Sequence, residues 1–337
     1  MKKNLVLSAA FVLAVAAVVA AALWWGLAPP RAAAPPVKLT VALSGTYIGS
    51  GLLFVAQERG YFAGEGLAVE LQRHTSGAAA LASALEGRAD LATAGDTPLT
   101  FTALKGTPFS IVATIFSAGK AHGMVARRDR GIVSAADLAG KAIGTTLGTD
   151  GHFVTGVMLS ANGLPLTAAR LVNLKPEELA GALADGTVDA IASWEPWIGK
   201  SSAALGDNAA VFRTDSGFLF NFSLAGRKVW VDENQDLVRR LLRALLRAAD
   251  LAESDPAGTQ ALVVKATGAD PAVFAADGPS YRLQVRLDQG MLIMLEDQVR
   301  WAINAGLTER REAPNLLEVV DDRPLAAVKP SAVTVVR

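Results

Sequence analysis

Two loops that combine hydroxyl groups with glycines are the stretches of this sequence best suited to hold a small molecule. The loop Ser44–Gly51 follows an apolar segment, and its glycines let the backbone approach a ligand closely. The loop Thr145–His152 has a similar composition. Hydroxyls and the amides at a helix N-terminus can donate hydrogen bonds to a solute. The G-x-G-x-x-G spacing of a dinucleotide site is absent, so the loops predict a polar-solute site of another kind.

Two acidic residues stand at corresponding places after apolar segments. Asp96 follows the predicted strand Asp90–Ala94, and Glu195 follows the predicted strand Asp189–Ser193. Trp194 offers a flat apolar wall with one N–H donor, and a buried structural role is the alternative. For Glu195, capping of the next helix is the alternative to ligand contact.

These carboxylates bear on the charge of a ligand, because the candidate loops contain no lysine or arginine apart from Arg73. A unit charge about 4 Å from a carboxylate interacts by about 4 kcal/mol at an effective dielectric of ~20, whereas a helix N-terminus offers an anion only ~0.3–1 kcal/mol. If Asp96 and Glu195 both face the ligand, the sequence predicts a neutral or cationic molecule with N–H donors, such as an aminopyrimidine or an amidine.

Several kinds of chemistry lack the residues they need. The chain has no cysteine, which excludes disulfides, thiolate metal sites and cysteine nucleophiles. His74, His122 and His152 have spacings that match no local metal motif, and no nucleophile with an adjacent base can be identified. Lys+Arg and Asp+Glu both number 32, so there is no basic excess for nucleic acid. We therefore predict no catalytic residue, no metal site, no cofactor and no nucleic-acid partner.

Alternating strands and helices must position the candidate loops. The order strand, helix, strand, helix, strand runs from Val37 to Ala94 and again from Lys141 to Ser193. Such an order implies parallel sheets joined by right-handed crossovers. Ligands of open α/β sheets bind at the carboxyl ends of the strands, where the candidate loops fall.

The two sets of elements align at one constant offset of 99 residues. Gly45 falls on Gly144. Asp90 likewise falls on Asp189. The alternative explanation is that any two strand–helix–strand units share glycine-rich loops. The ungapped alignment favours two similar lobes that face each other across a cleft.

The pattern changes after Gly217. A strand is predicted at Phe218–Leu224, and a last long helix at Arg282–Ala305 is closed by Gly306. Between them, Asp236–Leu251 is predicted as an amphipathic helix. Its polar face, which is either solvated or a docking surface for a partner, carries Arg239, Arg240, Arg243 and Arg247.

The N-terminal segment indicates export. Met1–Asn4 is basic, and Leu5–Trp25 contains 21 residues without a charge, enough to span the ~30 Å hydrocarbon core. We therefore predict a signal peptide or signal anchor at residues 1–28 and a Pro-rich linker at residues 29–36. Cleavage after an A-x-A site and retention as a membrane anchor are both compatible with this pattern.

Several motifs between residues 122 and 197 resemble those of a known family. They comprise His122–Arg127, Asp137–Gly144, Leu147–Thr149, Asn173–Glu178 and the run Asp189-Ala190-x-x-x-Trp194-Glu195-Pro196-Trp197. These residues are similar to the solute-binding proteins of ABC importers for sulfonates, nitrate and taurine, whose superfamily includes thiamine-pyrimidine binders. The resemblance extends over roughly residues 38–307.

The resemblance implies an α/β protein of the type II periplasmic binding fold, in which two lobes enclose a ligand cleft. Lobe 1 would comprise residues 37–120 and 217–306, and lobe 2 residues 121–216. The crossovers would fall near Lys120–Gly123 and Asp215–Phe218. An N-terminal apolar helix would precede the lobes, and residues 307–337 would form a C-terminal extension.

The resemblance also implies a function. The protein would be a periplasmic or otherwise extracytoplasmic monomer, attached to the membrane through residues 5–25 if that segment is retained. Hinge closure would capture a small polar organic solute, of the sulfonate, nitrate or taurine type or of the aminopyrimidine type. The solute would then pass to an ABC permease and its ATPase. The alternatives are an enzyme on the same scaffold, such as a thiamine-pyrimidine-forming protein, and a ligand sensor for a separate membrane kinase.

The residues expected to bind the ligand follow the strand ends of both lobes. A plain capping role is the alternative for Ser76 and for one of Thr149 and Asp150. The predicted set is Ser44, Thr46, Tyr47, Thr75, Ser76, Asp96, Thr97, Thr146, Thr149, His152, Trp194 and Glu195.

Overall fold

The computed structural model describes residues 35–213 and 219–336. The predicted apolar helix within residues 1–28, most of the linker at residues 29–36 and the second predicted crossover lie outside the described residues. In the described part of the chain, no helix combines the length and apolar character needed to cross a bilayer.

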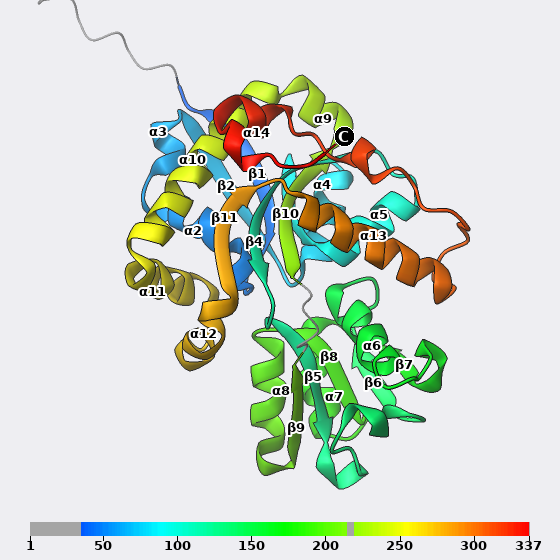
Figure 1. The fold of residues 1–337 in the computed structure, drawn as a ribbon. Coiled ribbons are helices and arrows are strands. Elements are labelled where there is room, and N and C mark those ends of the chain that lie inside the picture. The colour runs from blue at the N-terminus through cyan, green and yellow to red at the C-terminus, as the bar shows by residue number, and fades with distance from the viewer. Residues whose placement is uncertain (1–34, 214–218, 337) are drawn as a thin grey trace, which may run out of the picture. The chain divides into compact units, whose positions relative to one another are not determined.

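The strands form two separate sheets (Figure 1). The six-stranded sheet has, in spatial order, β11 (Tyr281–Arg286), β4 (Phe109–Ala118), β10 (Phe220–Arg227), β3 (Leu91–Gly95), β1 (Val37–Ser44) and β2 (Leu67–His74). Strands β1, β2 and β3 are parallel, and β10 runs antiparallel between β3 and β4. We call the part of the molecule built on this sheet, residues 37–118 and 220–336, lobe 1.

The second sheet comes from one continuous stretch of chain, residues 122–213, which we call lobe 2. Its spatial order is β7 (Arg170–Asn173), β6 (Ala142–Thr145), β8 (Ala190–Trp194), β5 (His122–Arg127) and β9 (Ala209–Arg213). Strands β6, β7 and β8 are parallel, and β5 is antiparallel to both of its neighbours. In each sheet, three parallel strands therefore lie side by side, and an antiparallel strand, β10 or β5, lies next to the third of them.

A polar contact at the third parallel strand recurs in both lobes. The Asp90 carboxylate accepts a hydrogen bond from the Thr40 backbone N–H at 2.8 Å. The Asp189 carboxylate accepts one from the Ala142 N–H at 2.9 Å. These equivalent contacts join the third strand to the first in each lobe, which supports an internal repeat.

The constant offset of 99 residues is wrong for the first strand of the repeat. Asp90 and Asp189 are 99 positions apart, but their partners Thr40 and Ala142 are 102 positions apart. Gly144 accordingly lies inside β6, whereas its expected counterpart at position 45 follows β1. The loop after β1 is the longer one, so an ungapped alignment cannot match both strand and loop.

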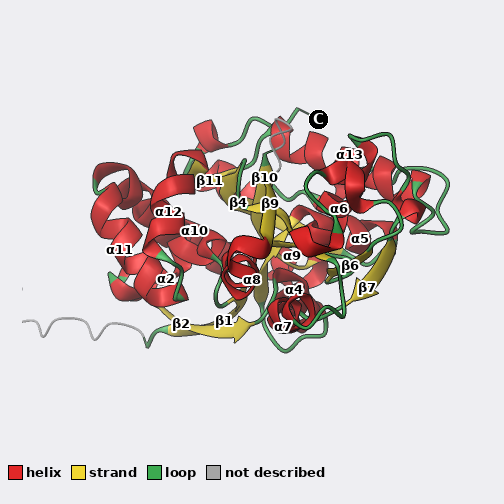
Figure 2. Ribbon diagram, turned by 90° about the horizontal axis from the view of Figure 1, so that it is seen from below, coloured by secondary structure: helices red, strands yellow, loops and turns green. Residues whose placement is uncertain are grey.

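Helices cover both faces of the six-stranded sheet (Figure 1, Figure 2). One face carries α2 (Gly51–Glu58), α3 (Tyr61–Gly64), α10 (Gln235–Ser254), α11 (Pro256–Thr267) and α12 (Pro271–Asp277). The other helices of lobe 1 are α4 (Gly77–Leu85), α5 (Asp96–Leu104), α9 (Lys228–Glu233), α13 (Gln289–Asn304) and α14 (Arg323–Val328). Lobe 2 contains α6 (Asp150–Ser160), α7 (Leu179–Ala184) and α8 (Trp197–Leu205).

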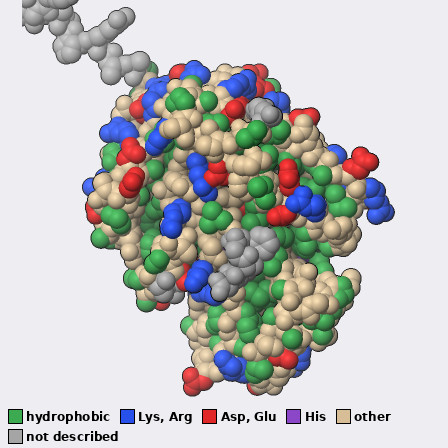
Figure 3. Space-filling model, viewed as in Figure 1, with side chains coloured by type: hydrophobic (Ala, Val, Ile, Leu, Met, Phe, Trp, Pro, Cys, Tyr) green, Lys and Arg blue, Asp and Glu red, His purple; other side chains and the backbone are tan. Residues whose placement is uncertain are grey.

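The arginine row of α10 binds within the chain. Arg243 pairs with the Glu65 carboxylate at 2.7 Å, and Arg240 donates to the backbone carbonyl of the same residue. Arg247 lies 4.3 Å from the centre of the Tyr61 ring. These three arginines hold α3 and the following turn onto α10, and their side chains also keep contact with solvent. On the face drawn in Figure 3, basic and acidic side chains are interspersed.

Residues 281–286 form the edge strand β11, so the predicted helix at Arg282–Ala305 is wrong over its first residues. The buried Tyr281 and Val285 are four residues apart, a spacing that also suits a helix. The strand is established by antiparallel pairing with β4, in which Tyr281 lies opposite Ala118. The helix α13 begins at Gln289, where the Asp288 side chain caps its first turn.

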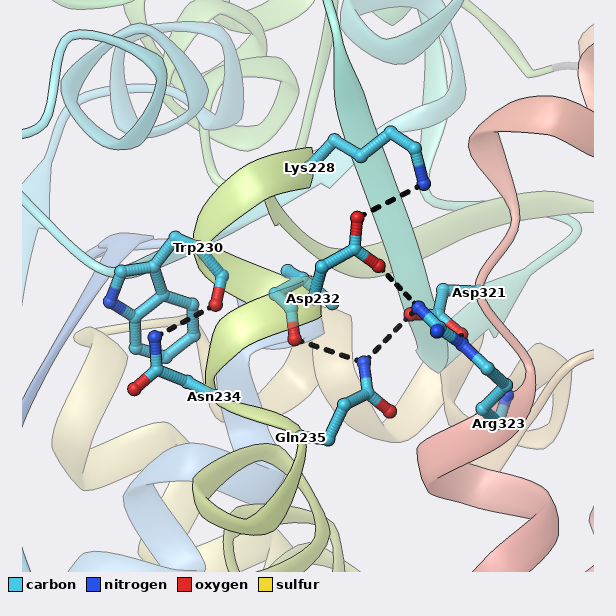
Figure 4. A network of polar contacts seen from close by, with 8 residues as sticks. Lys228, Trp230, Asp232, Asn234, Gln235, Asp321 and Arg323 are labelled. Carbon is cyan, nitrogen blue, oxygen red and sulfur yellow. Dashed lines mark hydrogen bonds and ion pairs between the residues drawn. The ribbon is translucent and has the colours of Figure 1, made fainter.

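The chain after α13 folds back onto lobe 1 (Figure 4). The Asp321 backbone N–H donates to the Ile111 carbonyl in β4 at 2.9 Å. The Asp321 carboxylate accepts a hydrogen bond from Gln235 at 2.9 Å and pairs with Arg323, which also bridges to Asp232. This network ties α14 to α9 and the start of α10, so residues 307–337 are packed against lobe 1 where they are described.

Candidate ligand-binding site

A small cavity, which we call the inner cavity, lies between the lobes where β1, β3 and β8 end. Its volume is about 20 Å³, room for about one water molecule. The carboxyl edge of parallel strands is where α/β proteins bind ligands. Lobe 1 contributes Ser44, Tyr47, Gly77, Ala78, Gly95, Pro98 and Phe222, and lobe 2 contributes His122, Thr149, Asp150 and Trp194.

The Asp150 side chain, which belongs to lobe 2, contacts lobe 1 at this cavity. It is the first residue of α6, and its Oδ1 accepts a hydrogen bond from the Thr97 backbone N–H in the first turn of α5 at 2.9 Å. Its Oδ2 lies 3.6 Å from Nε2 of His122. A side chain at Gly95 would overlap the Asp150 carboxylate, which explains the glycine at the end of β3.

Asp96 is buried beside this contact. Its Oδ2 accepts a hydrogen bond from the Asn221 backbone N–H at 2.7 Å, and its Oδ1 has no hydrogen-bond partner among the described residues. Burial raises the pKa of Asp96 well above its usual range, and the Asp150 carboxylate adds to the rise. A protonated Asp96 can donate a hydrogen bond, and it does not repel an anion.

The ring of Tyr47 forms one wall of the inner cavity. It packs edge-on against Phe116 and Phe222, with ring centroids 5.7 and 4.9 Å apart. A side chain at Gly49 would overlap this ring, so the loop requires glycine there. Burial raises the pKa of Tyr47, and the charge of Asp150 contributes, so the phenol keeps its proton.

Glu195 faces a larger groove of about 760 Å³ that both lobes line. Its Oε1 pairs with Nη2 of Arg213 at 2.6 Å, and its Oε2 accepts from the Gly199 backbone N–H at 3.1 Å. The predicted ligand charge depends on Glu195 and Asp96 both facing the ligand. Glu195 is paired with Arg213, and burial raises the pKa of Asp96, so the two carboxyl groups differ in their surroundings and the ligand charge stays a prediction. Asp150 is the carboxylate that lines the inner cavity.

His152 faces lobe 1 and lines a separate pocket with Phe101, so the structure does not bring this predicted ligand residue to the inner cavity. Its ring stacks on Phe101 with centroids 6.3 Å apart and meets Trp301 edge-on at 5.1 Å. Burial lowers the pKa of His152 to about 4. Gly156, one turn later, lies so close to Trp301 that a side chain would overlap the indole. The helix α6 therefore packs on α5 and α13 across the boundary between the lobes.

Other predicted ligand residues have local structural contacts. Ser76 caps α4 by accepting from the Ala79 backbone N–H at 3.2 Å. The Thr146 hydroxyl donates to a backbone carbonyl after β7 at 2.7 Å, and the Thr149 hydroxyl donates to the Thr146 carbonyl at 2.6 Å. Thr75 is exposed. These contacts fit the capping and loop-closing roles of hydroxyl side chains.

The structure brings part of the predicted set together. Ser44, Tyr47, Thr149 and Trp194 line the inner cavity, and Thr97 contacts Asp150 beside it. Thr46 adjoins Tyr47, and its buried Oγ1 has no hydrogen-bond partner among the described residues. Nor do those residues contain a group of three or more His, Asp or Glu side chains that could hold a metal ion. Residues at the site that the sequence did not predict as ligand contacts include His122, Asp150, Arg213, Asn221 and Phe222.

Comparisons with known proteins match this geometry to a family and a fold. A family described as NMT1/THI5 like matches residues 49–259, which include strands of both sheets. A protein of Escherichia coli named as an aliphatic sulfonates-binding protein is 28% identical over 192 residues, 56% of this chain and 59% of that protein.

Solved structures share the arrangement of both lobes. The alkanesulfonate-binding protein SsuA from Xanthomonas axonopodis, bound to MOPS, has a TM-score of 0.74 at 22% identity, over 86% of this chain and 100% of that one. The desulfurization enzyme DSZB has a TM-score of 0.62 at 20% identity, over 88% and 99%. The chain therefore has the mixed α/β fold of periplasmic binding proteins, a fold that an enzyme also uses.

Proposed function

The chain belongs to the NMT1/THI5-like family, and from this premise we propose that it is the extracytoplasmic substrate-binding component of an ABC importer. It captures a small polar organic solute between its lobes and presents the closed form to a permease and its ATPase. Solute contacts with both lobes favour closure, because they exist only when the lobes approach each other.

The observation that carries this proposal is the inner cavity, which both lobes line with polar groups. Ser44 lines this cavity and keeps a buried hydroxyl without a hydrogen-bond partner among the described residues. Asp96 and Ser193, next in the chain to the lining residues Gly95 and Trp194, each have a buried polar atom in the same state. Buried polar atoms are rarely left unpaired, so these groups are suited to a polar solute. Trp194 supplies an apolar wall from lobe 2.

The solute is of the sulfonate, nitrate or taurine type or of the aminopyrimidine type. The ion pair between Glu195 and Arg213, and the raised pKa of Asp96, both reduce the repulsion that a bound anion would meet. The name of the Escherichia coli relative also favours a sulfonate. Asp150 remains as a negative group at the inner cavity.

Titration calorimetry of the purified full-length protein tests this function. Four solutes would be titrated separately: ethanesulfonate, taurine, nitrate and a hydroxymethyl-aminopyrimidine. A parallel titration of each would record tryptophan fluorescence. We expect one class to bind at one site per chain and to change the fluorescence, because Trp194 lines the cavity. No binding of any solute, together with no small molecule bound in native mass spectrometry of protein from its own cells, would contradict the proposal.

An enzyme is the second candidate, because the fold is shared with DSZB. The inner cavity contains His122 beside Asp150, a pair that could hold a proton during a reaction. Mass spectrometry of each solute before and after incubation separates the two functions. A binding protein leaves the solute unchanged, whereas an enzyme converts it.

A further inference from the structure

The contact of Asp150 with lobe 1 places a carboxylate where an anion is stabilised. The α5 helix has nine residues, and its N-terminal amides point toward the end of the helix. The Thr97 amide donates to Asp150 Oδ1, and the His122 ring lies beside Oδ2. Gly95 leaves the space that the carboxylate fills. We call this position, formed by Gly95, Thr97 and His122, the anion seat.

A second observation connects the anion seat with ligand binding. Gly95, His122 and Asp150 all line the inner cavity, and Ser44 lines the same cavity. The Ser44 side chain is buried, and its Oγ has no hydrogen-bond partner among the described residues. The seat is therefore continuous with a polar cavity whose groups are not all satisfied by the protein itself.

The small volume of the inner cavity means that the lobes must separate before a solute can bind. A space of about 20 Å³ holds about one water molecule, so a sulfonate cannot enter while the lobes are in this contact. The lobes must separate first, and separation withdraws Asp150 from Thr97 because the two residues lie on different lobes. The acidic group of an incoming solute and the Asp150 carboxylate then have the same seat available.

We propose that Asp150 is a tethered anion that holds the lobes together by occupying the seat that the solute's acidic group takes. This inference rests on the proposed function. It adds that the Asp150 side chain competes with the solute for the anion seat. Because the competitor favours the closed arrangement without solute, it reduces the fraction of molecules that are open to binding. The apparent affinity for an anionic solute falls by that fraction.

Two variants test the proposal through different atoms. Asp150→Asn removes the charge at nearly constant shape. Gly95→Ala leaves the carboxylate in place but blocks its seat, and the φ of −73° at Gly95 is one that alanine adopts readily. Asp207→Asn is the control, because Asp207 is an exposed acid of lobe 2 outside the inner cavity. Circular dichroism checks that each variant is folded.

The first measurement is the distance between the lobes without solute. The chain has no cysteine, so Lys105→Cys in lobe 1 and Glu177→Cys in lobe 2 can be spin-labelled without background. We expect Asp150→Asn and Gly95→Ala to shift the distance distribution to longer values, and Asp207→Asn to leave it unchanged. Unchanged distances in both test variants would overturn the proposal, whatever the solute proves to be.

The second measurement is the affinity for ethanesulfonate. We expect Asp150→Asn to bind it more tightly, by about tenfold, because the competing closed form is lost. Weaker binding by this variant would overturn the proposal, since it would make Asp150 a partner of the solute. A third outcome separates the two claims. If neither the wild type nor any variant binds a solute, the proposed function fails. If the distances between the lobes still increase in the test variants, the contact of Asp150 with lobe 1 is nevertheless supported.

Discussion

The surroundings of Asp96, Glu195 and Asp150 give three carboxylates three different properties. Asp96 and Glu195 stand at the same place after the third parallel strand of their lobes, yet one has a raised pKa and the other is paired with Arg213. Asp150 makes its contact across the lobe boundary. Residue type and position along the chain were therefore not enough to assign the charge of the site.

His152 makes stability depend on pH. The unfolded chain binds a proton at this ring near pH 6.5, whereas burial lowers the folded-state pKa to about 4, so acid favours unfolding between these values. Relative to His152→Gln, the wild type should lose about 2 kcal/mol of unfolding free energy between pH 7 and pH 5. Urea unfolding at both pH values measures this difference.

The partly buried His74 provides the matched control for this experiment. Burial also lowers the pKa of His74, but the ring keeps more solvent exposure than His152. We expect His74→Gln to change the pH dependence less than His152→Gln does. An equal loss of stability in the wild type and in His152→Gln would show that the His152 ring is accessible to protons in the folded protein.

Trp194 is expected to anchor the solute. Its side chain is buried at the inner cavity, so Trp194→Ala should weaken solute binding by about 1–3 kcal/mol and should reduce the fluorescence change. Calorimetry with the solute identified for the wild type measures the loss. Trp230→Ala, in α9 of lobe 1, is the control and should bind as the wild type does. Unchanged affinity in folded Trp194→Ala would remove this residue from the site.

At the scale of elements, the closing surface of α6 is made by small and aromatic residues. Gly156 lies against Trp301, so Gly156→Leu should prevent α6 from reaching α13. We expect longer distances between the lobes without solute, as in Asp150→Asn, but weaker solute binding, by about tenfold or more. Asp150→Asn should bind the solute more tightly because Asp150 no longer competes for the anion seat. Gly156→Leu should bind it more weakly because the lobes cannot close around it. Normal closure in Gly156→Leu would contradict this account of α6.

The sequence predicted elements well where local pattern and packing agree. The third parallel strands β3 and β8 are predicted within one residue of their bounds, and the amphipathic α10 within three. The strand β11 was mistaken for helix, because leucine and arginine also favour helices and only pairing with β4 reveals the strand. Local patterns do not record which distant segment a strand will pair with.

The same limit applies to the candidate site. Ser44 and Trp194 could be found because ligand sites follow strand ends. Asp150 was seen only as a helix cap, since its partner Thr97 is 53 residues away on the other lobe. Arg213 and Asn221 lie on strands without any local motif, so only the folded chain brings them to Glu195 and Asp96.

At the scale of the whole molecule, the chain after residue 306 is expected to be required for the stability of lobe 1. Leu316, Val320 and Leu325 are buried, and each contributes about 1.5–3 kcal/mol through burial. Truncation after Gly306 should lower the melting temperature of the protein and weaken solute binding only through that loss. Calorimetric melting compares the truncated and full-length proteins. An unchanged melting temperature would mean that this segment only covers the surface.

The interleaving of the two sheets bears on how the protein is made. A chain emerges N-terminal end first, whether from a ribosome or from a membrane translocon. When Arg213 has emerged, all five strands of the lobe 2 sheet are present, but β3 and β4 still lack the strand that lies between them, Phe220–Arg227. Lobe 2 should therefore fold first, although lobe 1 begins earlier in the chain. Until residues 220–227 emerge, the facing edges of β3 and β4 keep unpaired backbone groups that can bind other chains. Proteolysis of stalled nascent chains would detect a protected lobe 2 beside an unprotected lobe 1, and this interval is where a holding chaperone would matter most.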